Sequence, residues 1–137
     1  MTPPSFERVM YIGLSVTNLE RSSEWYRRVL GFMVERVGSQ SPTWDEVLLR
    51  HERTDVRIGL IRHRSNDGQP FSELRTGLDH VELEVASMDE LEAWRRWLDD
   101  AGVPHSGARP HIVTFRDPDN IQLEVYCAAR ASNGPEA

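Results

Sequence analysis

The chain has 137 residues, a net charge of −6 and 39% hydrophobic residues, which is the composition of an ordinary globular protein with one domain and its own core. The negative charge argues against nucleic acid or an anionic membrane as a partner, because both require a clustered positive surface. No apolar run approaches the roughly 20 residues that a membrane span needs, so we expect a cytoplasmic protein.

The first half of the chain predicts one strand, one helix and three further strands. Apolar and polar residues alternate over 9–16, as in a strand with one buried face. Thr17 or Asn18 can cap the helix that follows, and Gly31 ends it. The remaining strands are expected near 32–38, 44–51 and 55–63.

The second half repeats this order after a polar linker at 64–76. Its first strand begins near Leu78. Ser87 and Glu90 have the spacing of a capping box, which predicts a helix from about 88 to 101. Further strands are expected near 103–106, 111–116 and 121–127. The tail at 128–137 has no apolar pattern, and we expect it to be disordered.

The repeat is visible in the residues themselves. Tyr11-Ile-Gly-Leu-Ser-Val16 recurs as His80-Val-Glu-Leu-Glu-Val85, and Trp25 and Trp94 stand at the same offset in the two helices. The fold class is therefore α+β, with two tandem β-α-β-β-β modules. We place module one at 8–63 and module two at 77–127, within one domain that spans 1–127.

Helical spacing also places Trp25, Trp94 and Trp97 in the core.

Strand alternation separates two faces, and each helix must cover the apolar one. Chemically active side chains then gather on the opposite face. Glu124 is the most informative of them, because a carboxylate flanked by Leu123 and Val125 is costly to bury without a metal, a cation or hydrogen-bond donors. The residues on this face are Tyr11, Gly13, Ser15, Arg57, Gly59, Ile61, His63, His80, Glu82, Glu84, Gln122, Glu124 and Tyr126.

The layout and three motifs resemble the vicinal oxygen chelate superfamily, which contains glyoxalase I, extradiol dioxygenases and bleomycin-binding proteins. The motifs are the segment Leu19–Phe32, Gly77-Leu-Asp-His80, and Asp117-Pro-Asp-Asn120 followed by Glu124. The resemblance implies that the inner faces curve into a cup-shaped mixed sheet that binds a small molecule. It also implies a homodimer.

In such proteins metal ligands occupy four repeat-related positions, which are Tyr11, Gly59, His80 and Glu124 in this chain. Glycine cannot ligate a metal, and we expect Tyr11 to donate a hydrogen bond instead. We therefore expect no cofactor. A divalent metal is the alternative, held by His80, Glu124 and His63 as two histidines and one carboxylate. Gly59 should leave room that a ligand ring could fill.

The first functional hypothesis is an enzyme with isomerase, lyase or cyclase proton-transfer chemistry on an oxygenated or aromatic metabolite. His80 would move the proton, oriented or charged by Glu124, while Tyr11 would stabilise an oxyanion. One alternative is a metal-free binding protein that sequesters a toxic small molecule. Another is a metalloenzyme or dioxygenase that uses His63, His80 and Glu124. The expected ligand-binding residues are Trp44, Arg57, Gly59, His63, Glu82, Gln122 and Tyr126.

Overall fold

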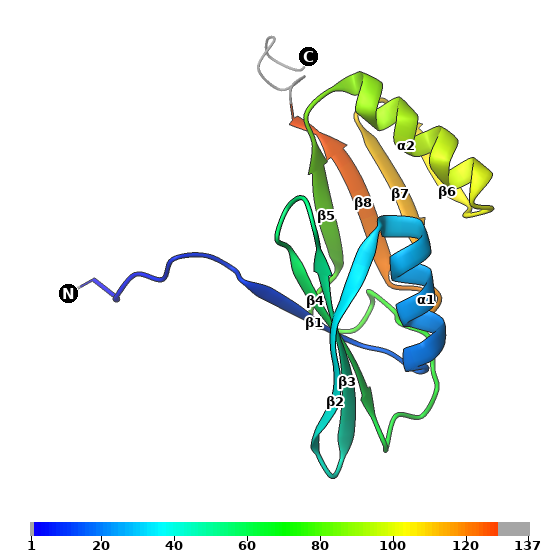
Figure 1. Ribbon diagram of the computed structural model, residues 1–137. Coiled ribbons are helices and arrows are strands. Elements are labelled where there is room, and N and C mark those ends of the chain that lie inside the picture. Colours follow the sequence, from blue (N-terminus) through cyan, green and yellow to red (C-terminus); the bar gives the residue numbers. More distant parts are fainter. Residues whose placement is uncertain (1, 129–137) are drawn as a thin grey trace. The chain divides into compact units, whose positions relative to one another are not determined.

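In the computed structural model, which describes residues 2–128, each half of the chain forms one helix and one four-stranded sheet (Figure 1). The described residues form two compact units that divide after Gly68. The first unit comprises β1 Tyr11–Ser15, α1 Leu19–Leu30, β2 Phe32–Ser41, β3 Trp44–His51 and β4 Arg57–His63. The second comprises β5 His80–Val85, α2 Met88–Asp100, β6 His105–Arg109, β7 Ile112–Arg116 and β8 Gln122–Cys127.

The two sheets have the same topology, which confirms the α+β class and the tandem modules. The strand orders are β1-β4-β3-β2 and β5-β8-β7-β6. In each sheet the first and last strands of the module pair in parallel, and the other pairs are antiparallel. Except for Ala128, the expected tail at 128–137 lies outside the described residues. No helix among residues 2–128 is long and apolar enough to cross a membrane.

Local chemistry explains where the helices begin and end. Asn18, rather than Thr17, caps α1, because its side chain accepts the backbone N–H of Arg21 at 2.9 Å. Gly31 ends this helix with a φ of 73°, a conformation that favours glycine. At α2, Ser87 accepts the N–H of Glu90 at 3.2 Å, as the capping box predicts.

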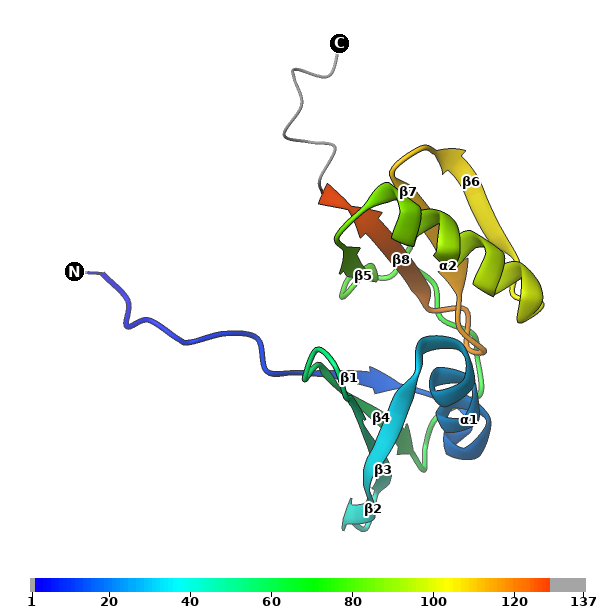
Figure 2. The ribbon, with the colours of Figure 1, turned by 45° about the horizontal axis from the view of Figure 1, so that its top comes forward.

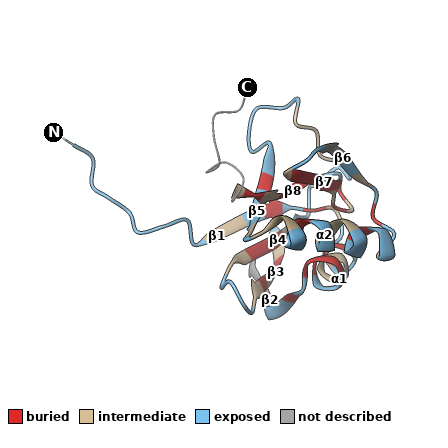
Figure 3. Cartoon of the chain, turned by 90° about the horizontal axis from the view of Figure 1, so that it is seen from above, coloured by how far each residue is buried: buried red, intermediate tan, exposed pale blue. Residues whose placement is uncertain are grey.

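Each helix covers the apolar face of its own sheet. Figure 2 shows α2 lying across β7 and β8, and Figure 3 shows buried residues alternating with less buried ones along the strands. Val113, Leu123 and Val125 are buried in this way beneath α2. The polar positions of the same strands are therefore left on the opposite face.

The placement of Trp97 in the core was wrong, because this side chain is 46% exposed. Leu91 and Leu98 lie two helical turns apart on α2 and are fully buried, so they form the face of the helix that meets the sheet. Trp97 is offset by about 100° from Leu98 around the helix and points away. Trp25 and Trp94 are half-buried.

The Asp117-Pro-Asp-Asn120 turn is held by a buried carboxylate. Asp117 Oδ1 accepts the backbone N–H groups of Asp119 at 2.8 Å and Ile121 at 2.9 Å. We expect Asp117→Ala to lower the free energy of unfolding by about 1–3 kcal/mol, because buried donors lose their acceptor. Urea denaturation measures this, with Asp117→Asn as the control that keeps one acceptor oxygen. Equal stability of the alanine variant and the wild type would refute this role.

Apolar side chains remain exposed on edge strand β2 and in the segment before β1. Because exposed apolar patches often mark interaction surfaces, a homodimer remains our prediction. Static light scattering should give about twice the 15.7 kDa mass of one chain. A 15.7 kDa particle at micromolar concentration would contradict it. The exposed side chains are Met33, Val34, Val37, Phe6, Val9 and Met10.

Candidate functional site

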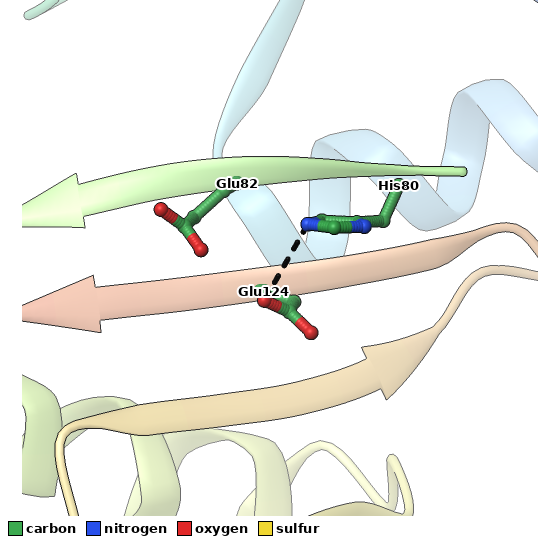
Figure 4. Close-up of side chains that lie close together, drawn as sticks. All are labelled: His80, Glu82 and Glu124. Carbon is green, nitrogen blue, oxygen red and sulfur yellow. Dashed lines mark ion pairs between the residues drawn. The ribbon is translucent and has the colours of Figure 1, made fainter. Parts of the chain in front are cut away.

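Three ionisable side chains meet on the polar face of the second sheet (Figure 4). His80 and Glu82 come from β5, and Glu124 comes from its parallel neighbour β8, where it is the register partner of Glu82. One ligand atom from each of the three residues lies within 4.8 Å of the others. The structure thus joins His80 and Glu124, two of the three residues predicted for catalysis, with Glu82, which was predicted only to bind a ligand.

His80 is oriented by Asp79, which was not among the predicted site residues. Its Nδ1 lies 2.7 Å from Asp79 Oδ1, and because a carboxylate accepts hydrogen bonds, Nδ1 bears the proton. Nε2 lies 3.7 Å from Glu124 Oε2. The hydrogen bond to Asp79 raises the pKa of His80, and the charges of Glu124 and Glu82 act in the same direction, against the effect of burial. Asp79 belongs to the motif Gly77-Leu-Asp-His80, and this motif could have pointed to it as a site residue.

Glu124 is held in place by two donors, as its position on a buried strand requires. Its side chain is 13% exposed. Oε1 accepts a hydrogen bond from the Gln122 amide at 2.9 Å and from the Thr114 hydroxyl at 3.2 Å. Gln122, expected to bind a ligand, therefore contacts Glu124. These bonds orient Glu124 so that Oε2 is the oxygen that lies towards His80.

Glu82 is a carboxyl group with an increased affinity for protons. Partial burial raises its pKa, and the hydrogen bond and charge of Glu124 raise it further, while His80 opposes them. Two neighbouring carboxylates are most stable when they share a proton or a cation. The cluster can therefore take up positive charge.

The donor set also fits a divalent cation. An imidazole nitrogen with carboxylate oxygens suits zinc, iron or manganese, and ligands about 2.0–2.2 Å from an ion lie up to about 4.4 Å apart. The 3.7 Å separation of His80 Nε2 and Glu124 Oε2 is compatible with this geometry. Asp79 and Gln122 would orient the ligands from behind. The third donor gathered here is Glu82, whereas His63 belongs to β4 of the first unit.

The repeat-related position in the first unit is filled by Tyr11. Gly13 and Gly59 are register partners on parallel strands β1 and β4, as Glu82 and Glu124 are in the second unit. The Tyr11 ring lies against Gly59 so closely that a Cβ added there would overlap Tyr11 Oη. The expected room for a ligand ring beside Gly59 is therefore absent, because a neighbouring side chain occupies it.

The hydroxyl of Tyr11 is engaged by a carboxylate. It donates to Glu46 Oε1 at 2.7 Å, and Glu46 Oε2 accepts from Arg36 at 2.9 Å. Burial and Glu46 raise the pKa of Tyr11 to about 12. The phenol is therefore neutral, and its proton is directed to Glu46. Glu46 was not among the predicted site residues, although it stands beside an apolar strand residue, Val47, as Glu124 stands beside Leu123 and Val125.

The other residues predicted to bind a ligand are not part of the cluster of described side chains. The Arg57 guanidinium forms ion pairs with Glu35 at 3.0 Å and Asp55 at 3.1 Å. Trp44 is half-buried at the start of β3, and its register partner His63 is exposed. Tyr126 packs edge-to-face on His111, with ring centroids 5.6 Å apart.

Comparison with known proteins agrees with the resemblance seen in the motifs. The family model for the Glyoxalase/Bleomycin resistance protein/Dioxygenase superfamily matches residues 8–125. A probable lactoylglutathione lyase of Vibrio parahaemolyticus is 25% identical over 134 residues, which cover 94% of this chain and 96% of the relative.

Solved structures share the fold. A glyoxylase/bleomycin resistance protein/dioxygenase domain from Frankia sp. EAN1pec is 30% identical, with a TM-score of 0.80, over 90% of this chain and 98% of that one. The trypanothione-dependent glyoxalase I of Leishmania major is 20% identical, with a TM-score of 0.69, over 92% of this chain and 90% of that one. The latter similarity supports the fold alone.

Proposed function

The chain belongs to the glyoxalase, bleomycin resistance protein and dioxygenase superfamily, and we propose that it is an enzyme that transfers a proton on a small oxygenated metabolite. The reaction would be of the isomerase or lyase type. The observation that supports this proposal is the cluster of His80, Glu82 and Glu124, one imidazole between carboxylates on neighbouring strands. The name of the Vibrio relative, a probable lactoylglutathione lyase, points to the same type of reaction.

Glu82 is the group that accepts the proton from the substrate carbon. A carboxylate with a raised pKa is a stronger base than an ordinary one, and catalytic efficiency rises as that pKa approaches the working pH. Glu124 stabilises the protonated product by sharing its proton. The proposed base is therefore Glu82, whereas the sequence led us to expect that His80 moves the proton.

His80 stabilises negative charge on the substrate oxygen. Because Asp79 raises its pKa, His80 retains a positive charge more readily than an isolated histidine. Its Nε2–H, on the side of the ring away from Asp79, is the donor for the developing oxyanion. Tyr11 has a structural role in this proposal, since its proton is directed to Glu46.

A divalent cation supplies charge stabilisation in many members of the superfamily, by polarising substrate oxygens. Here His80 Nε2 and Glu124 Oε2 would hold it, with Asp79 and Gln122 orienting them, and the cation would then replace the Nε2–H donor. Glu82 would remain the proton acceptor.

Solvent exchange tests the proposed function. The protein is incubated in D₂O with small α-hydroxycarbonyl and aromatic carbonyl compounds, including lactoylglutathione, and ¹H NMR follows the C–H signal beside the carbonyl. We expect at least one compound to lose that signal, or to be converted, at a rate proportional to protein. Tight binding without exchange or conversion would instead indicate the sequestering protein.

A further inference from the structure

The segment before β5, residues 71–79, is attached at its beginning to a turn of its own unit. We call this segment the strap. The Phe71 N–H donates to the Asp119 carbonyl at 2.7 Å, and the Asn120 amide donates to the Phe71 carbonyl at 3.0 Å. Glu73 then accepts two hydrogen bonds from Arg116, at 2.8 and 3.3 Å. Four hydrogen bonds thus fix residues 71–73 to the end of β7 and the turn that follows it.

The end of the strap reaches the candidate site. Its last residue is Asp79, whose carboxylate holds His80 Nδ1 at 2.7 Å. The part of the strap that carries Asp79 is therefore bounded by the fixed residues 71–73 on one side and by strand β5 on the other. Between these two points Leu74 is 93% exposed, so this part of the strap has little packing of its own to hold it.

Arg116 also lies in the same row of the sheet as His80. Gln122 of β8 is the register partner of both residues, so the three side chains share one face across β7, β8 and β5. Neighbouring strands are about 4.8 Å apart, which places Arg116 about 10 Å from His80. Asp79 and Glu73 both raise the pKa of Arg116, Glu73 the more strongly. The positive charge of Arg116 thus acts on both ends of the strap.

We propose that Glu73 and Arg116 are positioning residues for the candidate site, which hold the strap so that Asp79 orients the His80 ring. The effect on catalysis rests on the proposed function, whereas the effect on the strap and on the His80 ring does not. Glu73 and Arg116 form a bidentate ion pair, and the hydrogen bonds from Arg116 lower the pKa of Glu73 to about 2. Glu73 is therefore ionised throughout the neutral pH range.

The test compares Glu73→Gln with the wild type by NMR, without substrate. Amide exchange at Phe71 reports on the strap, and the ¹⁵N shifts of the His80 ring report which nitrogen bears the proton in the neutral form. We expect exchange at Phe71 to become about tenfold faster, because local opening of the strap becomes easier. The His80 signals should shift from one tautomer towards a mixture.

Glu92→Gln is the matched control, because Glu92 also pairs with an arginine, Arg95, on α2 of the same unit. It should change neither signal. If Glu73→Gln behaves like Glu92→Gln, or frees the strap without altering His80, the positioning role is refuted. Backbone amide shifts of both variants verify that the fold is retained.

Charge reversal separates the attachment of the strap from the effect on Asp79. The double variant Glu73→Arg with Arg116→Glu restores an ion pair but replaces the positive charge that interacts with Asp79 by a carboxylate. We expect protection of the Phe71 amide to return while the His80 tautomer remains mixed. Return of His80 to the single wild-type tautomer would show that Arg116 acts only by holding the strap. It would refute a direct effect of the Arg116 charge on Asp79. Because neither readout uses substrate, absence of solvent exchange would refute the proposed function and leave this inference intact.

Discussion

Glu82→Gln should slow proton transfer by about 10² to 10⁴-fold, the usual contribution of a positioned acid or base. Glutamine keeps the size of the side chain but cannot accept the proton.

His80→Ala should slow proton transfer by a similar factor, because it removes the donor for the developing oxyanion. Glu124→Gln should do the same, since it removes the carboxylate that shares the Glu82 proton. The rate of C–H loss in D₂O, measured on an active compound, gives each value.

Glu84→Gln is the matched control for these variants. Glu84 lies on the same strand and face as Glu82, is exposed, and is not part of the cluster. Its replacement should leave the rate close to wild type. If Glu84→Gln is as slow as Glu82→Gln, the loss comes from a change in surface charge, and Glu82 is not the base.

Gly59→Ala should destabilise the protein by about 2–5 kcal/mol. The added Cβ would overlap the Tyr11 hydroxyl, so the ring must move and release Glu46. The expected cost combines overpacking of a filled site with the loss of a donor to a buried carboxylate. Urea denaturation measures the free energy of unfolding.

The variant Gly38→Ala and a double variant show whether the Tyr11 ring causes the destabilisation expected of Gly59→Ala. No atom lies within 4 Å of a Cβ built on Gly38, so that change should be nearly neutral. In a Tyr11→Ala background, Gly59→Ala should lose most of its cost, because the overlapping ring is gone. The same cost in both backgrounds would show that the effect belongs to the backbone at Gly59.

The fold could be predicted from the sequence because its determinants are local. Capping by Asn18 and Ser87, and the end of α1 at Gly31, follow from side chains within a few residues of the backbone groups they satisfy. Alternation along β5 and β8 likewise predicts that Glu82 and Glu124 lie on the polar face, and they are register partners there.

The missed features of the candidate site depend on contacts that periodicity does not encode. Glu46 meets Tyr11 only because β3, β4 and β1 are successive neighbours in the sheet, in a particular register. The Tyr11 ring can lie over Gly59 only because the parallel pairing of β1 and β4 brings them together. Asp79 precedes β5, so its orientation depends on the strap rather than on strand alternation.

The two units therefore use the same backbone positions differently. The pair Glu82 and Glu124 provides charged side chains, whereas the equivalent pair Gly13 and Gly59 provides only space, which Tyr11 fills. We therefore propose that the reacting groups lie in the second unit.

Shift mapping of ¹⁵N-labelled protein with the most active compound from the solvent-exchange panel shows which unit binds the substrate. We expect the largest amide shift changes along His80–Glu84 and Gln122–Tyr126. Changes confined to Tyr11–Ser15 and Arg57–His63, with residues 80–84 unaffected, would place the substrate in the first unit and refute the proposed site.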